Sequence, residues 1–168
     1  MNCAGIISDA FERIHETVHA AVEGLPSEDL NARLDKDANS IAWLVWHLTR
    51  VQDDHIADAA GTEQLWFGDW APRFGLPLEE ASTGYGHTSA QVASVRVTSA
   101  DLLLGYFDAV HERTTGFVRD LDGHALDRVV DDAWSPPVTL GVRLVSVISD
   151  DLQHAGQAAF VRGVLQRR

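Results

Sequence analysis

The sequence predicts an all-α protein built as a four-helix bundle, and three observations support this fold class. Four segments of the chain repeat apolar residues at steps of three and four, which is the spacing of one face of a helix. Capping or helix-ending residues flank these segments. No segment alternates apolar and polar residues over the length of a typical strand. Four amphipathic helices bury their apolar faces most simply against one another, as a bundle.

The first two helices are predicted in the N-terminal part of the chain. The first is expected to end near Gly24 and Pro26, because a glycine followed by a proline is common at a helix C-terminus. The second follows Asn39 or Ser40, either of which can cap it, and closes at Gly61. The apolar stripe of the first helix contains Ile7, Ala10, Phe11, Ile14, Val18, Ala21, Val22 and Leu25. The stripe of the second contains Ile41, Leu44, Val45, Leu48, Gln52, His55, Ile56 and Ala59.

The last two helices are predicted in the C-terminal half. The third starts at Thr98-Ser99 and ends at Asp122-Gly123. The fourth follows Pro136-Pro137 and is capped by Thr139. The stripe of the third contains Leu103, Tyr106, Phe107, Val110, Thr114, Phe117 and Leu121. The stripe of the fourth contains Leu144, Val147, Ile148, Asp151, Leu152, Ala155, Ala159 and Val164.

A long connection, from Gly61 to Val97, joins the second and third predicted helices. Connections of this length are uncommon unless they act as a lid or cross the fold. We expect this crossover loop to pack over one end of the bundle. Val92 to Val97 is its best candidate for a strand, although the run is short and solitary. The loop is too aromatic for a flexible linker, since it contains Trp66, Phe67, Trp70, Pro72, Phe74 and Pro77.

Length and charge narrow the classes of function. The 168 residues suit one domain, residues 1–168. The formal net charge of −12 argues against nucleic acid and anionic membranes, because phosphate binding depends on Lys and Arg. The longest apolar run, Ile41 to Trp46, is too short to cross a membrane, and the N-terminus lacks a signal-peptide pattern. The lone Cys3 cannot form an internal disulfide. We therefore expect a cytoplasmic protein.

Three residues are candidates for metal chemistry. Asp150 and His154 stand four apart on the fourth predicted helix, so both side chains leave the same face. His47 lies midway along the second predicted helix. A histidine from one helix and an i, i+4 pair from a facing helix can converge on one ion, which is a usual way of building metal sites in bundles. Three protein ligands would leave a coordination position open, as in catalytic zinc sites.

Each candidate also has a structural interpretation. An acid and a histidine at i, i+4 often form a modest pair on a helix surface, and a backbone carbonyl could satisfy His47. His15 and His19 form a second i, i+4 pair among glutamates, for which we favour a solvated face over the mouth of a pocket. His55 is either a core-edge residue or a pocket donor. No role is predicted for the other histidines, His87, His111 and His124.

Two stretches of the chain resemble the DinB/YfiT-like superfamily. Residues 39–48, NSIAWLVWHL, resemble its helix-two signature, in which a metal-binding histidine follows a Trp-Leu run. Residues 150–159, DDLQHAGQAA, resemble its helix-four signature, in which Gly-Gln comes shortly after the last histidine. The helix order and the long crossover also resemble that fold, so the resemblance covers nearly the whole chain.

The resemblance implies a divalent metal ion held by His47, Asp150 and His154. Many members have histidine at all three ligand positions, whereas this chain has Asp150 four residues before the last histidine. A carboxylate is a competent ligand for Zn, Ni, Mn or Fe, so the metal stays open, with zinc or nickel favoured. The Asp-Asp-x-x-His-Ala-Gly-Gln form of the motif resembles the mycothiol transferase branch of the superfamily.

That branch implies a metal-dependent S-transferase that uses a small-molecule thiol such as mycothiol. The ion would lower the pKa of the thiol, and the thiolate would attack a small electrophile held between the bundle and the aromatic loop. No catalytic residue beyond the metal ligands is predicted, and Cys3 has no part in this scheme. Two other functions stay open: a non-catalytic, stress-related bundle that binds metal or ligand, and a metal-dependent hydrolase. A homodimer formed through an apolar helix face is also plausible.

Overall fold

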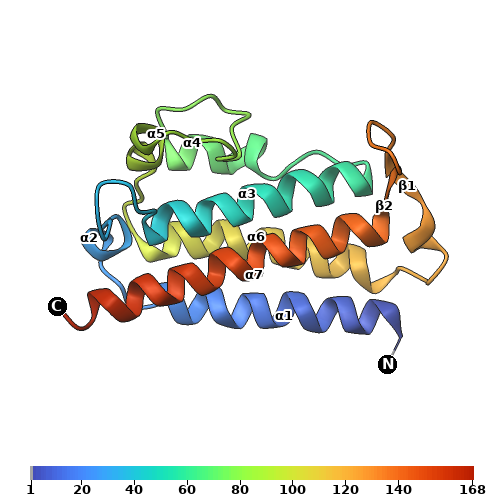
Figure 1. Cartoon of the computed structure of the whole chain (residues 1–168), viewed down its shortest axis with the longest axis horizontal. Coiled ribbons are helices and arrows are strands. Elements are labelled where there is room, and N and C mark those ends of the chain that lie inside the picture. Colours follow the sequence, from blue (N-terminus) through green and yellow to red (C-terminus); the bar gives the residue numbers. More distant parts are fainter. Residues whose placement is uncertain (1) are drawn as a thin grey trace.

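Residues 2–168 are described by a computed structural model, and within them four long helices form a bundle. The helices are α1 (Cys3–Val22), α3 (Ile41–Ala60), α6 (Ala100–Arg119) and α7 (Leu140–Leu165). Figure 1 shows them running side by side, with α1 and α3 each packed against both α6 and α7. The predicted all-α fold is confirmed. No helix within the described residues is long and apolar enough to cross a membrane.

Three helix starts and one helix end follow the capping residues predicted from the sequence, whereas α6 ends at Arg119, before the predicted Asp122-Gly123 pair. Ser40, Ser99 and Thr139 cap α3, α6 and α7, each accepting a hydrogen bond from a backbone N–H three residues on. Gly61 ends α3 with a left-handed φ of 68°, which a glycine adopts without steric cost. These ends are set by local hydrogen bonds, and for that reason they could be predicted without knowing the tertiary structure.

Short elements fill the connections, and two of them correct the sequence analysis. Val92–Val97 is not a strand: Ser89–Ser94 forms helix α5, begun by a capping box between Thr88 and Gln91. A small antiparallel hairpin, β1 (Val129–Asp131) and β2 (Val138–Thr139), was not predicted, because two or three residues cannot show an alternating pattern. The remaining short elements are α2 (Ser27–Leu30), η1 (Trp66–Trp70), α4 (Ala71–Phe74) and η2 (Ala125–Asp127).

The predicted apolar stripes form the core of the bundle. Phe11 and Ile14 of α1 are fully buried, as are Leu103 and Phe107 of α6. Helix α3 is exceptional because residues 41–50 are buried all round, which is possible only for a helix covered on its outer side as well. The cover is the crossover loop. It lies along α3 instead of over one end of the bundle, which corrects the position expected from the sequence (Figure 1).

Asp53 attaches the start of the crossover loop to the bundle. Its carboxylate, in the interior of α3, accepts hydrogen bonds from the backbone N–H of Leu65 at 3.0 Å and of Trp66 at 2.9 Å. It also accepts one from the hydroxyl of Tyr106 on α6, at 2.9 Å. Asp53 is 1% exposed and its nearby cation, Arg50, is fully buried 3.9 Å away. The loop is therefore held by a desolvated charged group with several partners.

Arg50 completes this attachment further along the loop. Its guanidinium donates to the carbonyl of Ser82 and to the side chain of Gln64, and it lies 4.9 Å from the centre of the Trp66 ring. A buried charge of this kind is tolerated only when hydrogen bonds and a counter-charge surround it. Arg50 thus ties the later part of the loop, which carries Ser82 and Thr83, to the middle of α3.

We predict that Asp53→Ala lowers the free energy of unfolding by about 3–5 kcal/mol, because it leaves the buried Arg50 without its counter-charge. Urea denaturation followed by circular dichroism measures the change. Asp58→Ala, an exposed aspartate on the same helix, is the matched control and should cost no more than about 0.5 kcal/mol. Equal losses in the two variants would contradict the anchoring role of Asp53.

Candidate metal centre

The structure brings His47, Asp150 and His154 together. Helix α3 lies against α7, and the i, i+4 spacing directs Asp150 and His154 toward His47. One ligand atom from each side chain lies within 4.8 Å of the other two. Nε2 of His154 is 3.6 Å from Oδ1 of Asp150, and the rings of His47 and His154 meet edge to face with centroids 4.8 Å apart. The three potential ligands therefore converge from two helices on one point.

The hydrogen bonds of both histidines leave Nε2 as the potential ligand atom. Nδ1 of His47 lies 2.6 Å from the carbonyl of Thr83, to which its N–H donates. Nδ1 of His154 is 3.1 Å from Oε1 of Gln157, which accepts in the same way. When Nδ1 carries the proton, Nε2 holds the free electron pair, and an oxygen partner on the outer nitrogen is the usual support of a metal-binding histidine.

Two aromatic side chains and a loop histidine fix the orientation of His47. Trp43, one turn earlier on α3, stacks on the His47 ring with centroids 4.6 Å apart and an interplanar angle of 18°. The indole N–H of Trp43 donates to Nδ1 of His87 at 3.1 Å. His87 is itself held by the hydroxyl of Ser82 at 2.8 Å and stacks on Trp46. No role was predicted for His87, because its two tryptophan partners lie more than 40 residues away along the chain.

Gly84 lets the crossover loop approach His47 closely. Its φ of +98° is a conformation that other residues rarely adopt. A Cβ at this position would lie 2.6 Å from Nδ1 of His47 and 3.1 Å from the Trp46 ring. The glycine is therefore required for two reasons, backbone conformation and space, and it places the Thr83 carbonyl against the imidazole.

Burial and neighbouring charges shift the pKa values of the three candidate ligands. Burial lowers the pKa of His47, which keeps this imidazole neutral. The neighbouring Asp150 carboxylate raises the pKa of His154 despite partial burial. Burial by itself would raise the pKa of Asp150, but the nearby histidines outweigh it and lower the pKa, so the carboxyl stays ionised.

One carboxylate oxygen of Asp150 lacks a hydrogen-bond partner within residues 2–168, as a potential metal ligand would. Its Oδ2 atom is buried and has no hydrogen-bond partner among the described residues. Buried carboxylate oxygens are normally paired, so an unpaired one next to two imidazoles is unusual. Two imidazole nitrogens and one carboxylate are ligands suited to zinc, nickel or iron. The residues present therefore fit a divalent metal ion.

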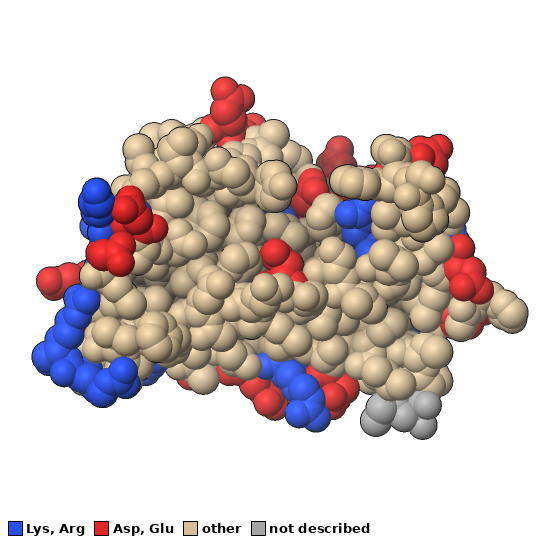
Figure 2. All heavy atoms as spheres, viewed as in Figure 1, with Lys and Arg blue, Asp and Glu red and all other residues tan. Residues whose placement is uncertain are grey.

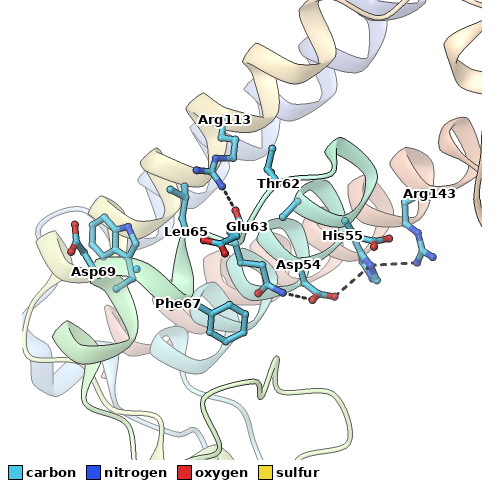
Figure 3. Close-up of a pocket in the computed structure, with 14 residues that line it drawn as sticks. Asp54, His55, Thr62, Glu63, Leu65, Phe67, Asp69, Arg113 and Arg143 are labelled. Atoms are coloured by element: carbon cyan, nitrogen blue, oxygen red, sulfur yellow. Dashed lines mark hydrogen bonds and ion pairs between the residues drawn. The ribbon is translucent and has the colours of Figure 1, made fainter.

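Two cavities that share Asp54 and His55 in their linings lie beside His47 and Asp150. The smaller, of about 410 Å³, is lined by His47 and Asp150 together with Thr83 and Tyr85 of the crossover loop. The larger, of about 990 Å³, extends from it along the start of the loop, and both include His55. Figure 3 shows the polar lining of the larger cavity, to which α3, the loop, α6 and α7 contribute Asp54, His55, Glu63, Asp69, Arg113 and Arg143. A substrate could therefore lie next to the candidate centre.

The remaining sequence candidates are not part of the three-residue cluster. His55 is a cavity residue, and its Nδ1 lies 3.4 Å from the guanidinium of Arg143. Cys3 is exposed at the start of α1. His15 and His19 belong to the opposite side of the bundle, where α1 meets α6.

Comparison with known proteins identifies the family. A family model described as mycothiol-S-transferase matches residues 6–166. The chain belongs to the mycothiol-S-transferase family. Membership confirms the resemblance to a DinB/YfiT-like group that the two sequence stretches indicated.

One solved structure shares the fold of this mycothiol-S-transferase family member over its whole length. It is the crystal structure of a conserved protein from Enterococcus faecalis, with 30% sequence identity and a TM-score of 0.92. The alignment covers 100% of this chain and 99% of that chain. No curated protein matches the sequence.

We predict that Gly84→Ala destabilises the protein by about 1–3 kcal/mol more than Gly86→Ala. Both glycines have positive φ, but a Cβ at Gly86 meets open space whereas one at Gly84 meets the His47 ring. Urea denaturation compares the two variants, and the imidazole NMR signals of His47 report whether its contact with Thr83 is lost. Equal destabilisation and an unchanged His47 signal in Gly84→Ala would contradict the close approach.

Proposed function

We propose that the chain is a metal-dependent thiol S-transferase in which His47, Asp150 and His154 hold one divalent ion. The observation that carries the proposal is the convergence of these three side chains beside a cavity that His47 and Asp150 line, with Nδ1 of each histidine held by an oxygen acceptor. Family membership supplies the reaction class, transfer of a mycothiol-type thiol to a small electrophile. Zinc or nickel is the proposed metal.

A divalent ion bound there would act as a Lewis acid that lowers the pKa of a thiol, so that thiolate is present at neutral pH. The residues of the chain have other tasks. Thr83 and Gln157 hold the two imidazoles in the tautomer that presents Nε2. Asp150 supplies a negative charge that attracts a cation. Trp43 and the crossover loop cover one side of His47 and exclude water from it.

The two cavities suit a hydrophilic thiol. Mycothiol is a hydroxyl-rich sugar thiol, and its hydroxyl groups both donate and accept hydrogen bonds. The cavities present carboxylates from Asp54 and Glu63 and guanidinium groups from Arg113 and Arg143. We propose that the thiol end lies in the smaller cavity and that the sugar end extends into the larger one.

We predict that purified protein retains about one divalent ion at this centre and that His154→Ala lowers its affinity for zinc by at least about 100-fold. Competition with a chromophoric chelator measures the affinity, and circular dichroism checks that the helices persist. Gln153→Ala, at an exposed neighbour on the same helix, is the matched control and should bind as the native protein does. Unchanged zinc affinity in His154→Ala would remove His154 from the centre.

The reaction is tested with metal-loaded protein, mycothiol and a panel of small electrophiles. We expect conjugate formation that stops on chelation and returns when the metal is restored. Zinc binding without conjugation would favour the non-catalytic binder, and ester or amide turnover without added thiol would favour the hydrolase. His154→Ala should be inactive whereas Gln153→Ala should not.

The homodimer and the cytoplasmic location, both expected from the sequence, stay predictions. A homodimer would form through an apolar helix face, and α7 exposes several large apolar side chains: Val142, Val145, Leu152 and Phe160. Figure 2 shows that much of the face crossed by α7 carries neither basic nor acidic residues, whereas Lys and Arg gather near the C-terminus. Sedimentation of the purified protein tests the dimer.

The cytoplasmic location is likewise a prediction.

A further inference from the structure

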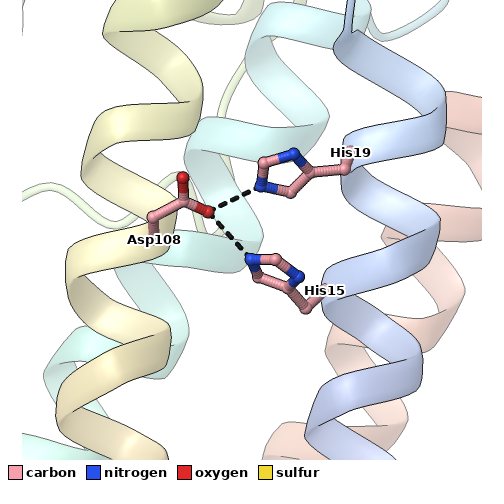
Figure 4. Close-up of side chains that lie close together, drawn as sticks. All are labelled: His15, His19 and Asp108. Carbon is pink, nitrogen blue, oxygen red and sulfur yellow. Dashed lines mark hydrogen bonds and ion pairs between the residues drawn. The ribbon is translucent and has the colours of Figure 1, made fainter.

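A second cluster of potential ligands lies between α1 and α6. His15 and His19, one turn apart on α1, both direct Nε2 at the same oxygen of Asp108 on α6 (Figure 4). The distances from Oδ1 are 3.0 Å to His15 and 2.7 Å to His19. One ligand atom from each of the three residues lies within 4.8 Å of the other two. The first centre is formed by α3 and α7, so the two clusters share no helix.

His19 has the hydrogen-bond support expected of a metal ligand. Its Nδ1 lies 2.7 Å from Oε1 of Glu23, one turn later on α1. A carboxylate on the outer nitrogen fixes the ring and increases the electron density of the inner nitrogen, as in carboxylate–histidine–zinc sites. Without an ion, both nitrogens of His19 face carboxylates. Burial by itself would lower the pKa of His19, but Asp108 and Glu23 outweigh it and raise the pKa.

The spacing of the three ligand atoms is close to that of a coordination sphere. Zinc binds nitrogen and oxygen at about 2.0–2.2 Å, so neighbouring ligand atoms in a tetrahedral site lie about 3.3 Å apart. The two distances to Asp108 need to grow by only about 0.3–0.6 Å to reach this value. Rotation of exposed side chains can supply such a change, since the Asp108 side chain is 44% exposed.

The surroundings favour a cation and allow it to enter. His111 on α6 stacks near His15, with centroids 4.5 Å apart, and its Nε2 lies 3.4 Å from Glu12. Phe107 of α6 stacks on the His15 ring, with ring centroids 5.7 Å apart. The cluster therefore has rings packed beneath it and acidic groups around it, while the side chains of His15 and His19 remain 30% and 23% exposed.

From this geometry we propose that His15, His19 and Asp108 form a second divalent-metal site, with zinc as the ion. In this site each Nε2 atom binds the ion through its free electron pair, and a carboxylate oxygen of Asp108 is the third ligand. The proton of each neutral imidazole is then on Nδ1, which in His19 donates to Glu23. The site joins α1 to α6 and leaves a coordination position open toward solvent. Its existence does not depend on the first centre or on the transferase reaction.

Zinc stoichiometry tests the proposal. The full-length protein is stripped with a chelator, dialysed to equilibrium against zinc and analysed for zinc per chain. We expect two ions in the native protein and one in the double variant His15→Ala/His19→Ala. Asp108→Asn preserves the shape of the side chain but removes its charge, and it should weaken binding of the second ion at least about tenfold. His124→Ala, at an exposed histidine outside both clusters, should still bind two.

A complementary variant separates this site from the proposed transferase centre. The double variant His47→Ala/His154→Ala should bind one ion, and adding His19→Ala to it should abolish binding. One ion in the native protein that is lost in His47→Ala/His154→Ala would overturn the second site and leave the first intact. One ion that is lost only with His15 and His19 would support the second site and remove the first. Circular dichroism confirms the helical fold of each variant.

Discussion

A single hydrogen bond, from Nδ1 of His47 to the carbonyl of Thr83, connects the bundle, the crossover loop and the candidate metal centre. An acceptor on Nδ1 favours the tautomer in which Nε2 carries the free electron pair, and it fixes the orientation of the ring. That acceptor lies 36 residues further along the chain, in the crossover loop. The buried Arg50 and Asp53, and the absence of a side chain at Gly84, bring the loop to the required distance.

This arrangement requires α3 to bury charged and polar side chains. Helix α3 buries an arginine, an aspartate and a histidine within two turns, and removing such groups from water costs free energy unless hydrogen bonds and counter-charges replace the lost hydration. The aromatic crossover loop compensates by supplying hydrogen bonds and ring contacts, among them the Trp66 ring over Arg50. The loop therefore combines two roles, since it completes the core around α3 and shapes the wall of both cavities.

Prediction from the sequence succeeded where the signal was local and failed where it was not. Helical periodicity and the capping residues Ser40, Ser99 and Thr139 located the four helices, because both depend on residues within one or two turns. The predicted course of the crossover loop was wrong. Asp53 fixes it by accepting hydrogen bonds from residues 12 and 13 positions away, in a segment without regular periodicity. His15 and His19 were interpreted as a solvated pair, because Asp108 is 89 residues from His19 and only the packing of α1 on α6 joins them.

The sequence by itself determined the fold class, the helix ends and the i, i+4 placement of Asp150 and His154, since all of these follow from the 3.6-residue turn of the helix. Only the tertiary structure decided that α3 faces α7, that Thr83 sets the tautomer of His47, and that Asp108 completes a second cluster with His15 and His19. The physical reason is that ligand geometry depends on distances of a few ångströms between helices. Periodicity reports which face of a helix is apolar, but it does not report which neighbouring helix that face meets.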